Sequence, residues 1–291
     1  MVQEKGYWTQ QLSRRRALRG AALTGAGLTA ATLIGCGGRQ ETPAATQAVQ
    51  QPKRGGILTH QNAHETQGRP LDPHRSTRTA AQGFRLFYQS LLRYHPETYV
   101  EGPELAQQWE QPSELEYIFT LQPGVHWHNK PPANGRALTI DDVVFSLNRA
   151  RTRHPEFQSR SLLEGVERLE AVDASHLRIT VKEPDAPFLF KLAADGLTIM
   201  APEVVEKADK FTTAAEVVGT GPFIMTSVQE GVGAEYVRNP AYWKPGLPYL
   251  DGLRTKHFAN DQLAYAAFLG GELDVSGLPG NEVKNYLERQ G

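Results

Sequence analysis

Three short motifs built around glycine or proline follow one another near the end of the chain and limit what it can fold into. They are residues 219–223 (GTGPF), 239–243 (NPAYW) and 271–275 (GELDV). Glycine adopts positive φ without strain and proline ends strand pairing, so these residues set where the backbone turns. The first motif predicts a tight turn before a strand over 223–228, and the glycines of 230–233 predict a turn into a second strand over 234–238. A β-hairpin is therefore expected here.

The residues after the second motif predict a strand, a helix and a further strand. A strand-like run covers 253–258, and Asn260 or Asp261 can cap a helix over 262–269. Two glycines then stop this helix before the third motif. The segment 273–275 of that motif predicts the last strand.

The order and content of these motifs resemble the family of dipeptide-, oligopeptide- and nickel-complex-binding proteins that serve ABC importers. In that family the pattern reads GTGPY, then RNPxYW, then a helix that closes on GELD. Residues 238–243 match the second motif in full, whereas Phe223 stands where tyrosine is usual. A phosphate-binding loop is the alternative for the first motif, but Pro222 removes a backbone N–H and a strand follows instead of a helix. Three motifs in register favour the family.

Other segments extend the resemblance from residue 55 to residue 275. The family opens with GGxLxxA, a polar loop and LDPH, which correspond to the stretch from 55 to 74, and residues 138–147 resemble its TAeDVvfSl segment. The resemblance implies an α/β fold, a periplasmic-binding-protein-like type II (class C) lobe. Such a lobe has a mixed β-sheet and an inserted α+β subdomain, and the second lobe is missing from this chain.

The resemblance also implies a division of the chain. Residues 55–81 and 199–275 are expected to form the main sheet of the first lobe, 82–198 the inserted subdomain, and 276–291 the start of a crossing to the second lobe. We therefore expect an N-terminal fragment or truncated reading frame. Half a cleft leaves much of a ligand hydrated, so such a fragment is expected to bind weakly and to aggregate.

Composition is that of an ordinary globular protein. Hydrophobic residues make up 40% of the 291 residues and charged residues 22%, which allows one or two domains with sizeable cores. The net charge is −1, but residues 1–35 carry +4 and the remainder −5. The remainder shows no basic surface, so a nucleic-acid partner is not expected.

The N-terminal 1–35 segment has the pattern of a signal peptide, with basic residues before a small-residue, mildly apolar run. Arg14 and Arg15 resemble the twin-arginine export signal, and ordinary Sec export is the alternative. Cys36, the single cysteine, follows Leu-Ile-Gly and resembles a lipobox, which implies acylation of its thiol. Residues 36–54 are then the lipidated cysteine and a disordered tether.

Apolar periodicity predicts the elements of the inserted part. Residues 83–92 show helical spacing and predict an amphipathic helix. Residues 115–121 alternate as a half-buried strand, which a Pro-Gly turn is expected to pair in a hairpin with 125–128. A second hairpin is expected from 166–172 and 177–181.

The pattern Thr139-Ile-Asp-Asp142 predicts a capping box and a helix over 139–151. Thr139 can accept the N–H of Asp142, and the carboxylate of Asp142 can reach back. The neighbouring acids Asp141 and Asp142 diverge on a helix by about 100°, so they are not expected to act on one substrate.

His126 and His128 lie at i, i+2 on one strand face and are candidate metal ligands. No cysteine and no obvious third ligand accompany them, so no metal site is predicted. The sequence also shows no phosphate loop, nucleophile elbow or dinucleotide fingerprint, so no cofactor is expected.

The resemblance implies that the polar loop between 61 and 71 lines the ligand cleft. Asn62, His64, Glu65 and Thr66 are the candidate contacts. A carboxylate such as Glu65 can receive a cationic amine, and the backbone can pair with an extended ligand. A solvated loop without ligand contacts is the alternative.

The function implied is that of a binding lipoprotein of an ABC-type importer, not an enzyme. It is expected to be exported and lipid-anchored, in the periplasm or on the outer face of the cytoplasmic membrane, and to deliver a peptide, a similar small solute or a metal chelate to a membrane permease. An extracytoplasmic ligand sensor with the same fold is the first alternative. An exported hydrolase is the second, and a His-plus-acid cluster in the cleft would be its mark.

Overall fold

The structure is a computed structural model that describes residues 52–61, 71–75, 82–95, 97–157, 159–208, 210–280 and 282–283. Within these ranges, no helix has the length and apolar character needed to cross a membrane.

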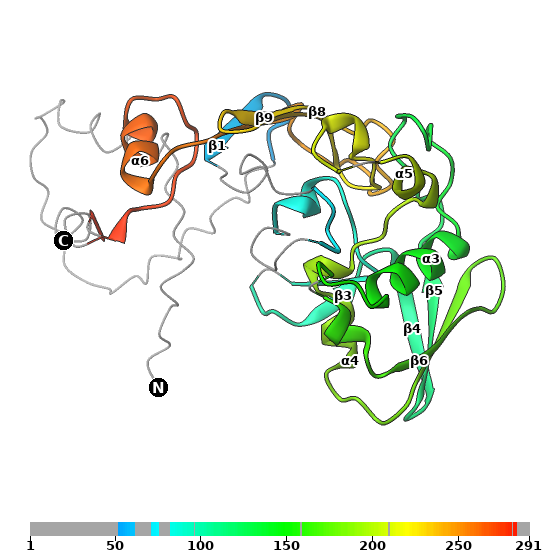
Figure 1. Cartoon of the computed structure of the whole chain (residues 1–291). Coiled ribbons are helices and arrows are strands. Elements are labelled where there is room, and N and C mark those ends of the chain that lie inside the picture. The colour runs from blue at the N-terminus through cyan, green and yellow to red at the C-terminus, as the bar shows by residue number, and fades with distance from the viewer. Residues whose placement is uncertain are drawn as a thin grey trace, which may run out of the picture.

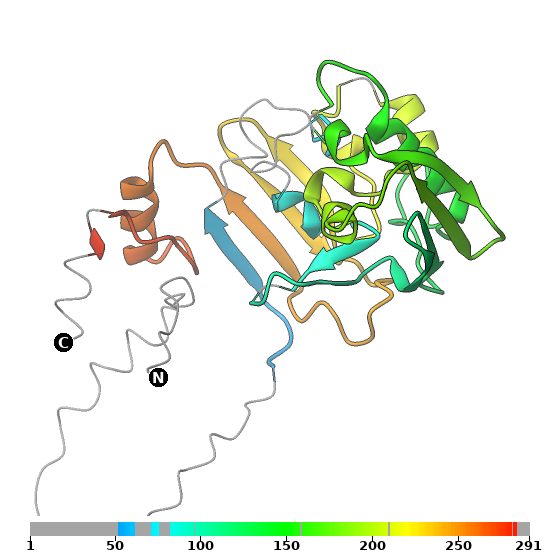
Figure 2. The same cartoon turned by 90° about the horizontal axis from the view of Figure 1, so that it is seen from below.

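The first sheet joins the start of the described chain to its far end. It contains β1 (Ile57–Gln61), β10 (Gly252–Lys256), β9 (Gly233–Arg238) and β8 (Phe223–Gln229), in the order β1-β10-β9-β8. β1 runs parallel to β10, whereas the other pairs are antiparallel. Figure 2 shows β1 in blue beside β10 in orange. The sheet is thus mixed, and the predicted hairpin is confirmed as β8 and β9.

One face of this sheet is buried. Leu58 lies opposite Leu253, which lies opposite Tyr236, which in turn lies opposite Met225, so one side chain from each strand meets the core. Met225 and Tyr236 are almost fully buried. Because side chains alternate along a strand, a slip of one residue would move this apolar row to the solvent face. The burial of the row therefore fixes the register of the strands.

The helix α6 (Asp261–Leu269) confirms the prediction after β10. Asn260 caps it, and its Oδ1 accepts the N–H of Leu263 at 2.9 Å. The strand expected at 273–275 is reduced to a single parallel bridge between Val275 and His60.

The second sheet comes wholly from residues 106–181. It contains β4 (Ala106–Ser113), β5 (Glu116–Leu121), β7 (His176–Val181) and β6 (Val166–Ala171), all antiparallel in the order β4-β5-β7-β6. Figure 1 shows it at the lower right, with the first sheet along the top. The hairpin of β6 and β7 matches the prediction. The division into a main sheet and an inserted subdomain at 82 and 198 stays a prediction.

The prediction of a hairpin between residues 115–121 and 125–128 is wrong. Both edges of β5 are occupied, one by β4 and the other by β7. The 125–128 segment instead bonds outside this sheet, since His128 N–H donates to Gly219 O at 2.8 Å. A Pro-Gly turn signals a change of direction but does not choose the partner.

The helix expected over 83–92 was also wrong. Only the 3-10 turn η1 (Gln82–Leu86) forms, and the carbonyls after it accept from distant segments. Phe87 O accepts from Gly221 N at 3.0 Å, and Gln89 O from Ile199 N at 2.7 Å. These bonds replace the i−4 ladder of a helix, so the apolar spacing reports burial in the core.

A short two-stranded sheet continues this segment: β2 (Leu92–Tyr94) pairs with β3 (Glu101–Pro103). One hydrophobic core joins the two larger sheets, since Phe119 of β5 and Tyr236 of β9 belong to the same cluster. The ring of Phe87 stacks on Tyr236 with centroids 6.1 Å apart. The remaining elements are η2 (Arg160–Leu163), α4 (Phe188–Leu192), η3 (Asp195–Leu197), α5 (Pro202–Lys207) and η4 (Ala214–Glu216).

The helix α3 (Ile140–Arg151) begins at the predicted capping box. Thr139 Oγ1 accepts the N–H of Asp142 at 3.3 Å, and Asp142 Oδ2 accepts the N–H of Thr139 at 2.9 Å. The stripe of Val143, Leu147 and Ala150 is buried, as the sequence predicts.

Thr139→Ala is expected to lower the free energy of unfolding by about 1 kcal/mol, because it removes a side-chain acceptor from the start of α3. Urea unfolding measures this change. Thr212→Ala replaces an exposed threonine and is the control. An unchanged midpoint for Thr139→Ala would show that the cap adds nothing to stability.

Candidate functional site

The predicted functional side chains lie outside the described residues. The structure describes both ends of the predicted ligand loop, which are the end of β1 at Gln61 and the segment 71–75. The candidate site comprises these two ends and the residues that pack against them. The side chains outside the description are Asn62, His64, Glu65, Thr66, Cys36, Arg14 and Arg15.

A buried ion pair holds the segment 71–75 in place. The side chain of Asp72 is fully buried, and Arg149 of α3 reaches it with two nitrogens, Nη1 at 3.0 Å from Oδ1 and Nη2 at 2.6 Å from Oδ2. The N–H of Leu71 also donates to Phe211 O at 2.6 Å. A bidentate arginine fixes orientation as well as distance, so the far end of the predicted ligand loop is anchored.

His74 completes this anchor. Its Nε2 donates to Thr198 O at 3.0 Å, and its Nδ1 accepts from Arg149 Nη1 at 2.8 Å. Burial lowers the pKa of His74 from 6.5 to about 4. Both ring nitrogens of His74 are thus occupied and the ring is neutral at pH 7, so His74 offers no base to a substrate.

An apolar cavity of about 410 Å³ adjoins the anchored segment. A Cβ at Gly196 would lie 1.8 Å from Ser159 Oγ and 3.7 Å from Pro73 O, so the backbone at Gly196 lies next to the 71–75 segment. Its volume and mostly apolar lining are typical of small-molecule sites. It is lined by Tyr94, Ser159, Ser161, Leu162, Pro187, Phe190, Lys191, Ala194, Asp195 and Gly196.

The two charged side chains that line the cavity form ion pairs with residues outside it. Asp195 pairs with Arg85, and Lys191 Nζ lies 2.6 Å from Asp185 Oδ2. The hydroxyls of Ser159 and Ser161 and the exposed ring of Phe190 remain at the lining. The cavity therefore offers apolar contact with a few polar groups.

Sequence reasoning missed this cavity. Its residues come from three separate parts of the chain, β2, η2 and the neighbouring α4 and η3, and carry no common periodicity. The Asp195-Gly196 pair is a turn signal, but it does not indicate a ligand. Only the tertiary arrangement identifies these residues.

The glycine motif at 219–223 has a structural role. A Cβ at Gly219 would lie 1.8 Å from Phe87 O, and one at Gly221 would lie 2.8 Å from Leu86 O, so only glycine fits. Asn239 of the second motif donates to Gly221 O at 3.0 Å. The first two motifs thus lock against each other.

The aromatic residues of the second motif form a partly buried polar network. Trp243 Nε1 donates to Gln89 Oε1 at 2.9 Å, and Gln89 Nε2 donates to Tyr242 OH at 3.3 Å. Gln89 Nε2 also lies 3.4 Å from Glu104 Oε1. The network ties the loop after β9 to the segment after η1, and we assign it to stability.

The two histidines that are candidate metal ligands differ in burial and in their hydrogen-bond partners. His128 is fully buried, with Nε2 donating to Gly221 O at 3.1 Å and Nδ1 accepting from Gly219 N at 3.2 Å. His126 is exposed and bonds to Gly124 O at 3.1 Å. In the described ranges, no three His, Cys, Asp or Glu side chains are grouped to hold a metal ion.

Comparison with curated proteins finds similar binding proteins. The chain is 30% identical over 233 residues to "Di/tripeptide-binding protein 2" of Pseudomonas aeruginosa, a match that covers 72% of this chain and 42% of the relative. It is 31% identical over 205 residues to "Heme-binding protein A" of Haemophilus influenzae, covering 65% and 37%. The matches thus span about two fifths of these relatives' length.

Solved structures show the same fold. The ABC transporter-associated periplasmic binding protein DppA of Helicobacter pylori, in complex with peptide STSA, aligns with a TM-score of 0.70 at 28% identity over 80% of this chain and 49% of that chain. The oligopeptide-binding protein AppA of Bacillus subtilis, in complex with a nonapeptide, aligns with a TM-score of 0.70 at 21% identity over 80% and 46%. The α/β periplasmic-binding-protein fold expected from the sequence is confirmed.

A family model described as bacterial extracellular solute-binding proteins, family 5 middle, matches residues 102–291. This range is well over half of the chain and includes all three motifs at 219–275. The chain belongs to family 5 of the bacterial extracellular solute-binding proteins.

Proposed function

We propose that this protein is the substrate-binding component of an ABC-type importer and that it binds a peptide or a similar small solute, metal chelates included. The observation that carries the proposal is the anchored 71–75 segment, which ends the predicted ligand loop beside an apolar cavity of about 410 Å³. A loop that is anchored at one end loses less conformational entropy when a ligand orders it, so binding costs less free energy.

The proposed contacts come from two places. Asn62, His64, Glu65 and Thr66 of the loop supply polar groups, and Glu65 receives a ligand amine. The cavity supplies apolar contact for a side chain or an equivalent group. This combination suits short peptides, and the peptide-binding names and complexes among the relatives support it.

The identity of the ligand is the first test. The protein is purified from its native membranes without added ligand, denatured, and the released small molecules are identified by mass spectrometry. We expect peptides or one small solute class in near-stoichiometric amount. Co-purification of a permease supports import, whereas capture of a sensor kinase would favour the sensor. Absence of any bound molecule, with no binding from a peptide and chelate library, would contradict the proposal.

We also propose that the protein is exported and lipid-anchored through Cys36, with Arg14 and Arg15 in the export signal. Cys36→Ser is expected to move the protein from the membrane to the soluble fraction or to stall it as precursor, because stable anchoring needs acyl chains. Intact-mass spectrometry checks this. A mature chain with an unmodified Cys36 thiol would rule the anchor out.

A further inference from the structure

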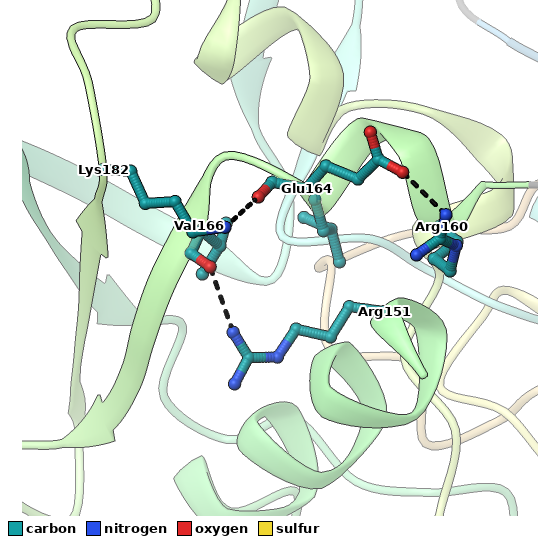
Figure 3. Close-up of a pocket in the computed structure, with 6 residues that line it drawn as sticks. Arg151, Arg160, Glu164, Val166 and Lys182 are labelled. Carbon is teal, nitrogen blue, oxygen red and sulfur yellow. Dashed lines mark hydrogen bonds and ion pairs between the residues drawn. The ribbon is translucent and has the colours of Figure 1, made fainter. Parts of the chain in front are cut away.

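A second cavity, of about 560 Å³, lies where the end of α3 meets η2, β6 and the residue after β7 (Figure 3). It differs from the apolar cavity in its chemistry, because charged and polar groups dominate it. It is lined by Arg151, Arg160, Leu163, Glu164, Val166 and Lys182.

The two cavities lie on opposite sides of η2. Ser161 and Leu162 line the apolar cavity, whereas Arg160 and Leu163 line this one. In a 3-10 helix, residues three apart share a face, which explains the separation. The polar cavity is therefore distinct from the proposed solute site.

The cations of this cavity outnumber its carboxylate by three to one. Arg160 Nη2 donates to Glu164 Oε1 at 2.7 Å, so these two charges offset each other. Figure 3 shows the Glu164 side chain extending toward Arg160 and away from Arg151. The charges of Arg151 and Lys182 remain.

Backbone carbonyls hold both remaining cations. Arg151 Nη1 donates to Val166 O at 3.3 Å and Glu167 O at 3.4 Å, and Lys182 Nζ donates to Glu164 O at 2.9 Å. Across the described chain neither side chain forms an ion pair with a carboxylate. Carbonyls orient a cation without neutralising it, so two oriented positive charges face one polar cavity.

We propose that this cavity binds the phosphate ester of a polyol. The guanidinium of Arg151 keeps Nε and Nη2 for phosphate oxygens, and Lys182 adds a point charge. A cavity of about 560 Å³ exceeds the size of a phosphate group, and its backbone carbonyls suit ligand hydroxyls. A soluble glycerol phosphate and the headgroup of phosphatidylglycerol both carry this chemistry.

The first experiment measures the binding of glycerol 1-phosphate to the full-length chain by calorimetry. Glycerol is the uncharged control. The double substitution Arg151→Gln with Lys182→Gln is expected to weaken binding at least about tenfold, since it removes both uncompensated charges. The charge-matched control Arg168→Gln with Lys207→Gln changes two exposed cations outside the cavity and is expected to stay within about twofold.

A substitution that is expected to strengthen binding shows that weaker binding in the double variant does not come from misfolding. Glu164→Gln removes the only carboxylate of the lining and releases Arg160, so glycerol 1-phosphate is expected to bind about threefold to tenfold more tightly. Equal binding of glycerol, or equal effects of the cavity and control doubles, would overturn the proposal.

Vesicles distinguish the two sources of the ligand. The full chain carrying Cys36→Ser, so that no acyl anchor contributes, is floated with phosphatidylglycerol or phosphatidylcholine vesicles. Flotation with phosphatidylglycerol vesicles but not with phosphatidylcholine vesicles, lost in the double substitution of Arg151 and Lys182, assigns the lipid headgroup. Binding of the soluble ester without vesicle binding assigns a free phosphate ester. Failure to bind either probe would refute the site.

Discussion

Replacing Arg149 with alanine is expected to lower the free energy of unfolding by about 3–5 kcal/mol, because it removes the cation that pairs with the buried carboxylate of Asp72. The side chain of Asp72 is fully buried, and that of Arg149 is 15% exposed. His74 would lose the donor to its Nδ1 in the same change. Urea unfolding followed by circular dichroism measures the loss.

Arg151→Ala is the matched control, since it removes an arginine two positions along α3 that donates only to carbonyls. We expect a cost of about 1 kcal/mol there. The double substitution Asp72→Asn with Arg149→Gln completes a double-mutant cycle with the two single substitutions. Its loss of unfolding free energy should be at least about 1 kcal/mol smaller than the sum of the losses in Asp72→Asn and Arg149→Gln, because the charges act as a pair. Additive losses would show that the pair does not anchor the segment.

Lowering the pH from 6.5 to 4 is expected to destabilise the protein strongly. His74 and His128 are buried and neutral, and burial lowers the pKa of each from 6.5 to about 4. The unfolded chain therefore binds more protons than the folded chain in this window, so stability falls as pH falls. Each histidine contributes a loss of about 3 kcal/mol by pH 4.

Carboxyl groups modify this profile. Burial raises the pKa of Glu104, so its protonation favours the folded state as pH falls and offsets part of the loss. Burial alone would raise the pKa of Glu216, but the hydrogen bonds that its carboxylate accepts from backbone N–H groups lower the pKa to about 2. The stability that Glu216 contributes to the folded state is therefore lost only below about pH 4.5. Between pH 6.5 and 5 the histidines dominate.

Urea unfolding at pH 7, 6 and 5 tests this account. We expect the stability to fall steeply with pH, and His128→Gln to reduce that slope by about half, whatever it does to stability at pH 7. NMR titration of the histidine ring protons should show His74 and His128 still neutral at pH 5.5. A flat stability profile would contradict their buried neutral state.

Local signals in the sequence predicted several elements correctly. The turn glycines located the β8 and β9 hairpin, and Thr139 with Asp142 located the start of α3. Asn260 likewise marked the start of α6. Each depends on residues within a few positions of one another, so sequence patterns suffice.

Non-local pairing was beyond the sequence patterns. The apolar spacing of 83–92 indicated a helix, but Gly221 and Ile199 bind its carbonyls from far along the chain. The strand β5 found its partners in β4 and β7 instead of the segment after its turn. The two cavities have the same origin, since each gathers residues from separate elements.

The ligand loop provides the most direct test of the proposed function. Once the co-purified ligand is known, calorimetry compares the full protein with a variant carrying Asn62→Ala, His64→Ala, Glu65→Ala and Thr66→Ala. Gln229→Ala with Glu230→Ala, at the exposed end of β8 and the start of the turn to β9, is the control. We expect the loop variant to bind at least about a hundredfold more weakly and the control to bind unchanged. Equal affinity for the loop variant and the unaltered protein would contradict the assignment of this loop to ligand binding.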